Sequence, residues 1–160
     1  MNDEIIKLLT ERYYHDQDIS EWAIKCLEKG YDSKSLRILA SMPESLYSSS
    51  ETDDYLKRAL KELDWDNIEP EHYLMRYAKI LAKEIIENQI DPIKASRGIY
   101  QILIDLEYPS ELHGWYEIDE MIWDQEYFLK IGNKGYFYHP KEELISEIKK
   151  VSEELVKLKD

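Results

Sequence analysis

Apolar residues recur along this chain at intervals of three and four, the spacing at which side chains share one face of an α-helix. Segment 2–14 shows the pattern clearly, with Ile5, Leu8, Leu9 and Tyr13 on one face and charged residues on the other. Similar stripes recur as far as the last segment of the chain. The dominant pattern therefore predicts a helical protein in which each helix buries one side.

Capping residues predict where the first helices begin and end. Asp18 with Glu21 three residues later forms a capping-box pattern for a second helix, which Gly30 ends. Ser33 is expected to cap a short third helix, because its hydroxyl can accept a bond from a free backbone N–H. That helix should end before Pro43, since the residue preceding a proline disfavours the helical conformation.

Prolines mark the boundaries in the rest of the chain. Pro70 opens a fifth helix, and Asp91-Pro92 opens a sixth with an aspartate cap and a proline in the first turn. Pro109 closes the sixth helix and Pro140 opens the last one. With further helices expected at 51–63 and 116–125, the chain should form about eight helices, an order that also suits stacked helical hairpins.

One segment has a different character. Residues 127–138 are rich in aromatic side chains and contain Gly132, Asn133 and Gly135, a composition typical of two short strands joined by a tight turn. We therefore expect a small β-hairpin there. The predicted fold class is all-α, a multi-helix bundle forming a single domain over 1–160, with this one hairpin.

Size and composition indicate a folded protein of the cytoplasm. The chain has 160 residues, 43% of them hydrophobic and 34% charged, which suits one domain with its own core. No apolar run approaches the ~20 residues needed to span a bilayer. The first residues are acidic where a signal peptide is basic, and Cys26 is the only cysteine. These features predict a cytoplasmic location.

The net charge is −13, which repels phosphate backbones and anionic lipids. We therefore expect neither nucleic acid nor membrane as a direct partner. A basic protein is the natural partner for such a field, since opposite charges raise the rate of encounter. The alternative is that the charge serves solubility alone.

Acidic and aromatic residues gather in one segment. Between Arg97 and Lys130 there is no lysine or arginine, whereas eight acidic residues occur there. On a helix, Trp115, Ile118 and Ile122 would share the inner face and leave acids and aromatics outside. The alternative is that Trp115 and Trp123 are both core residues under a solvated surface. The predicted partner-binding residues are Tyr116, Glu117, Asp119, Glu120, Trp123, Asp124, Glu126 and Tyr127.

Signals for catalysis are weak, and no cofactor, metal ligand or catalytic residue is predicted. Cys26 lies within an apolar stripe, where a thiol behaves as a small hydrophobe. Glu69 and His72 have the spacing of ligands in di-metal helical bundles, but Glu69 directly precedes Pro70, where a carboxylate also serves as a cap. His113, beside a tryptophan, is expected to be structural.

Residues 30–40 and 91–100, which begin Gly30-Tyr31-Asp32-Ser33 and Asp91-Pro92-Ile93-Lys94, resemble a family of small, acidic, uncharacterised bacterial helical proteins. The two stretches cover less than a fifth of the chain. In type the family is similar to immunity proteins of bacterial toxin systems, so the resemblance implies a bacterial binding protein and brings no activity.

The favoured interpretation is a protein-binding module, most specifically an immunity protein or inhibitor that neutralises a basic toxin such as a nuclease through its acidic, aromatic face. An enzyme is less favoured. Two alternatives stay open: a metal-dependent or small-molecule-binding helical-bundle enzyme around Glu69 and His72, and a regulator that mimics DNA with spaced carboxylates.

Overall fold

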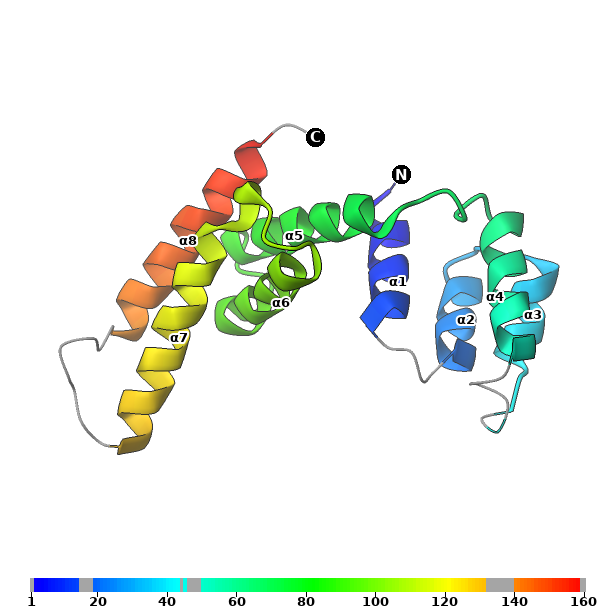
Figure 1. The fold of residues 1–160 in the computed structure, drawn as a ribbon, viewed down its shortest axis with the longest axis horizontal. Coiled ribbons are helices and arrows are strands. Elements are labelled where there is room, and N and C mark those ends of the chain that lie inside the picture. Colours follow the sequence, from blue (N-terminus) through cyan, green and yellow to red (C-terminus); the bar gives the residue numbers. More distant parts are fainter. Residues whose placement is uncertain (1, 15–18, 44, 46–49, 132–139, 159–160) are drawn as a thin grey trace. The chain divides into compact units, whose positions relative to one another are not determined.

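The computed structural model describes residues 2–14, 19–43, 45, 50–131 and 140–158 (Figure 1). Within these residues the chain forms eight α-helices and no strand, which confirms the predicted all-α class. The chain divides into two compact units, Met1–Tyr73 and Leu74–Asp160, and the boundary between them falls inside helix α5 (Pro70–Ile86). A single domain over the whole chain stays a prediction.

The first unit contains α1 (Asp3–Tyr14), α2 (Ile19–Glu28), α3 (Lys34–Ala40), α4 (Ser50–Glu62) and the start of α5. Helix α2 packs against both α1 and α3, and α3 packs against α4. The core is mainly apolar and includes residues that the periodicity predicts, Leu9, Ile19, Trp22, Leu36, Leu39 and Ala59, together with Ile6 and Trp65, which it does not. Tyr13 is an exception: we expected it inside, but it is 43% exposed at the end of α1.

Specific polar contacts join these helices. The Trp22 indole N–H donates to the carbonyl oxygen of Leu8 at 2.8 Å, which ties α2 to α1. The Glu62 carboxylate at the end of α4 accepts the backbone N–H of Ser35 at 2.9 Å and its hydroxyl at 2.8 Å. Because these groups belong to the first turn of α3, Glu62 satisfies a backbone donor that the helix itself leaves free.

Two predicted caps are confirmed. The Ser33 hydroxyl accepts the backbone N–H of Leu36 at the start of α3, and the Asp91 carboxylate accepts the N–H of Lys94 at the start of α6 (Pro92–Asp105). Asp18, the third predicted cap, lies outside the described residues.

The second unit contains the rest of α5, α6, a short 3₁₀ turn η2 (Ser110–Leu112), α7 (Gly114–Ile131) and α8 (Lys141–Lys157). Helices α6, α7 and α8 pack against one another, and Figure 1 shows α7 and α8 side by side. A Cβ at Gly114 would lie 3.0 Å from Cγ1 of Val151, so α7 and α8 approach closely there. The core includes Leu74, Leu81, Ile85, Ile99, Ile102, Leu103, Leu112, Trp115, Ile118, Ile122, Leu144, Ile148 and Leu155.

The predicted β-hairpin at 127–138 is wrong where the structure describes it, because residues 127–131 continue α7. Residues 132–138 lie outside the described part. The aromatic and branched side chains that favoured a strand follow directly on a packed helix, and extending a formed helix by one residue is far easier than starting one. No glycine or proline occurs between Gln125 and Gly132, so the helix continues beyond its predicted end at Gln125 and reaches Ile131.

Candidate protein-binding face on helix α7

Helix α7 has one side fixed by the core of the second unit. Trp115, Ile118 and Ile122 are all buried, with Trp115 only 1% exposed. They recur at intervals of three and four, so they line one face of the helix and direct the opposite face outwards. The periodicity predicted this division, but the sequence left open that Trp123 is a core residue as well. The structure places Trp115 in the core and Trp123 outside it.

Large aromatic side chains lie on the outward face. Tyr116 and Tyr127 are each 45% exposed and Trp123 is 61% exposed. The rings of Trp123 and Tyr127 stack with planes 6° apart and centroids 5.2 Å apart. Glu120 lies between Tyr116 and Trp123 in the sequence and on the same side of the helix. The four residues recur every three or four positions and form a row along the helix, which we call the α7 stripe: Tyr116, Glu120, Trp123 and Tyr127.

The acidic residues beside the α7 stripe differ in their surroundings. Glu126 forms an ion pair with Arg97 of α6. Asp119 is half-buried, and this burial raises the pKa of its carboxyl, although the charge of Arg97 opposes the shift. Glu126 is therefore paired within this chain, and the Asp119 carboxylate is only partly accessible from solvent.

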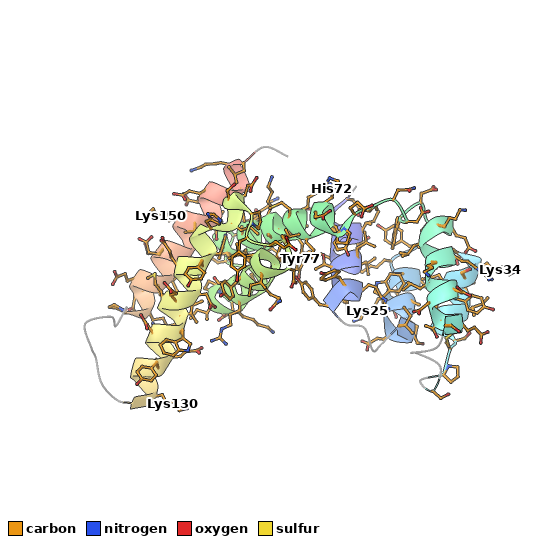
Figure 2. The ribbon with its side chains drawn as sticks, in the orientation of Figure 1. Lys25, Lys34, His72, Tyr77, Lys130 and Lys150 are labelled. Carbon is orange, nitrogen blue, oxygen red and sulfur yellow. The ribbon has the colours of Figure 1, made fainter. Side chains whose placement is uncertain are left out.

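Glu117, Glu120 and Asp124 carry the remaining negative charge of the predicted set. Glu117 and Glu120 are exposed and Asp124 is half-exposed, and none of the three forms an ion pair with a residue in the described part of the chain. Glu120 accepts a hydrogen bond from the Tyr116 hydroxyl, and its negative charge raises the pKa of that phenol. Lys130, labelled in Figure 2, lies in the last turn of α7 and is the first basic residue after Arg97.

Two further tyrosines adjoin this face, and neither belongs to the predicted partner-binding set. The Tyr100 ring on α6 lies 6.4 Å from that of Tyr116, and burial followed by the charge of Asp119 raises its pKa. Tyr108 is 51% exposed in the link between α6 and η2. Their position depends on how α6 packs against α7, which the spacing within one helix does not reveal.

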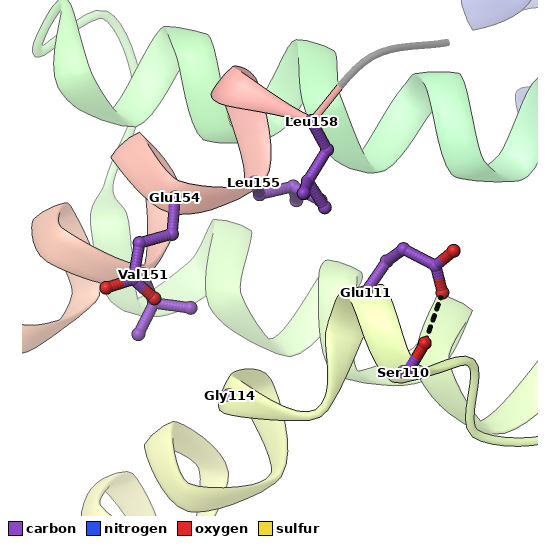
Figure 3. A pocket seen from close by; sticks show the side chains of 7 residues that line it. All are labelled: Ser110, Glu111, Gly114, Val151, Glu154, Leu155 and Leu158. Carbon is purple, nitrogen blue, oxygen red and sulfur yellow. Dashed lines mark hydrogen bonds between the residues drawn. The ribbon is translucent and has the colours of Figure 1, made fainter.

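A separate hollow lies between η2, the start of α7 and the end of α8 (Figure 3). Its volume is about 350 Å³, and Val151, Leu155 and Leu158 supply its apolar lining. Glu111 lies at its edge and accepts a hydrogen bond from the Ser110 hydroxyl at 3.1 Å. None of the predicted partner-binding residues lines it.

The other residues considered for chemistry are not assembled into a site. Glu69 and His72 are exposed, and no three His, Cys, Asp or Glu side chains within the described ranges cluster as metal ligands would. Burial raises the pKa of Cys26 to about 12, which suits a core thiol. The His113 ring donates from Nε2 to the carbonyl oxygen of Tyr108 at 3.0 Å, a structural role.

No helix in the described part of the chain is long and apolar enough to cross a membrane. Comparison with known protein families, curated proteins and solved structures found no match to this chain. The resemblance of residues 30–40 and 91–100 to acidic bacterial proteins therefore stays a prediction.

Proposed function

We propose that this protein is a protein-binding module that docks on a basic protein through the α7 stripe and the carboxylates beside it. In its most specific form, the proposal is an immunity protein or inhibitor that neutralises a basic toxin such as a nuclease. Inhibition would be steric and electrostatic, because an acidic helix face placed in a cationic cleft excludes the toxin's own substrate.

The observation that carries the proposal is the stacked pair of Trp123 and Tyr127 on the solvent side of α7. Aromatic side chains bury roughly 150–250 Å² each, which corresponds to about 4–6 kcal/mol at about 25 cal/mol per Å². Trp123 leaves 61% of its surface exposed, so most of this stabilisation is not used by the fold. Tryptophan and tyrosine are also the side chains that most often anchor protein interfaces.

The charges around the pair favour a cationic partner. Glu117, Glu120 and Asp124 surround aromatic anchors on a chain whose net charge is −13. Such a field accelerates encounters with basic proteins and repels nucleic acid. The like-charged Glu120 and Asp124 are one turn apart and cost the isolated helix ~0.2–0.5 kcal/mol, so helix stability does not account for them.

The test is capture of a basic partner at low salt, using purified products of adjacent genes of the source organism as candidates. The E120K/D124K variant should lose a partner that the wild type binds. The matched control is E153K/E154K, which makes the same change in net charge at two exposed positions of α8. Equal binding by wild type and E120K/D124K would remove this face from the proposal.

A further inference from the structure

We infer that the α7 stripe receives an arginine side chain of the basic partner, laid on the stack of Trp123 and Tyr127 and paired with Glu120 and Asp124. The inference rests on the proposed docking function and specifies its chemistry, namely a guanidinium in preference to an ammonium group.

The stack offers a flat surface of the right kind. Its two rings are nearly parallel, at 6°, and both are substantially exposed. The face of an aromatic ring attracts cations, and tryptophan does so most strongly. A guanidinium is planar and weakly hydrated, so it can lie flat on such a ring, whereas the compact ammonium of lysine keeps its water.

The two edges of the stack differ. On one side Glu126 is already paired with a guanidinium of this chain, that of Arg97. On the other side lie Glu120 and Asp124, which precede Trp123 and Tyr127 by three residues each and therefore lie one turn from them.

Neither Glu120 nor Asp124 forms an ion pair with the described residues. Glu120 accepts one hydrogen bond, from the Tyr116 hydroxyl, but a carboxylate has further acceptor positions, so both residues can still pair with a cation. An arginine lying on Trp123 can point its N–H fork at either carboxylate, an arrangement that a single ammonium cannot reproduce.

The position of the tryptophans provides a direct measurement. Trp22, Trp65 and Trp115 are buried, so acrylamide added to the intact protein should quench chiefly Trp123. Fluorescently labelled hexa-arginine and hexa-lysine peptides serve as probes, with affinity measured by anisotropy. We expect hexa-arginine to bind about five to thirty times more tightly than hexa-lysine and to protect Trp123 from acrylamide.

Two variants separate this inference from the proposed function. W123L keeps an apolar side chain but removes the stronger of the two π faces and leaves that of Tyr127, so the preference for arginine should fall to about twofold or less, while E153K/E154K should retain it. Equal affinity for both peptides in the wild type, with both weakened in E120K/D124K, would overturn the arginine inference and leave the docking face in place. Binding of both peptides unchanged in E120K/D124K would overturn both.

Discussion

Arg97 on α6 forms an ion pair with Glu126 on α7, a residue 29 positions further along the chain. This contact brings a positive charge to the edge of the α7 stripe and removes one carboxylate from those offered to a partner. The proposed docking face is therefore narrower than the acidic sequence suggests, and its unpaired carboxylates are concentrated on the side of Glu120 and Asp124.

Replacing Arg97 by alanine should strengthen binding of hexa-arginine at low salt, by about twofold to threefold, because Glu126 becomes available to the ligand. Stability should fall by less than about 1 kcal/mol, since both partners of the ion pair are about half exposed. Peptide titration and urea unfolding measure the two effects. Lys94→Ala is the control, because it removes the same charge from α6 without releasing Glu126; equal gains in both variants would show that only net charge matters.

Truncating the two tryptophans of α7 should lower the stability of the protein by very different amounts. Trp115→Ala should cost about 3–5 kcal/mol, the usual range for deleting a buried aromatic side chain. Trp123→Ala should cost far less, about 1 kcal/mol, because most of its side chain is in solvent and the variant chiefly loses the stacking on Tyr127. Urea unfolding of both variants measures the difference. A large loss at Trp123 would show that the fold itself uses this side chain.

Glu62 should make the stability of the first unit depend on pH. The hydrogen bonds that its carboxylate accepts from the backbone and hydroxyl of Ser35 lower its pKa below the ordinary value of 4.5. Since the folded pKa is the lower one, the stabilisation is complete above the unfolded pKa and is lost as the pH falls through the folded pKa.

Glu62→Gln should therefore be less stable than wild type at about pH 7, and the difference should shrink at about pH 3. Urea unfolding at the two pH values tests this. Lys61→Gln, an exposed position next to Glu62 on α4, should show no such acid-dependent difference. A gap between wild type and Glu62→Gln that persists in acid would mean that the carboxylate charge is not responsible.

Cys26 should be inert in the folded protein. Burial, with a smaller effect from the charge of Glu11, raises its pKa to about 12, so little thiolate exists at about pH 8. Modification by an aromatic disulfide reagent should be slower in buffer than in concentrated urea by about a thousandfold. Fast reaction in buffer would indicate that α2 opens locally around the thiol.

Much of the fold could be predicted because its determinants are local. The side chains of Ser33 and Asp91 cap helices through bonds to residues three positions away, and such pairs can be recognised from spacing alone. The division of α7 into a buried side with Trp115 and an exposed side with Trp123 follows from the same periodicity.

What failed depends on packing between distant segments. The aromatic residues after Gln125 have strand propensity. However, α7 is stabilised by its contacts with α6 and α8, and the helix continues through residues 126–131. The pairing of Arg97 with Glu126 and of Ser35 with Glu62 joins residues on different helices. The sequence shows that these charged and polar side chains exist but not which of them meet.

The close approach of α7 and α8 links the sizes of two residues far apart in the sequence. Gly114 leaves room for Val151, and even a methyl group at position 114 would press on that side chain. A chain with the same packing that carries alanine or serine at position 114 would need a smaller residue at position 151. Compensating changes of this kind would mark distant relatives that a comparison of motifs overlooks, and would give the alignment needed to ask whether Trp123 and Tyr127 have been retained.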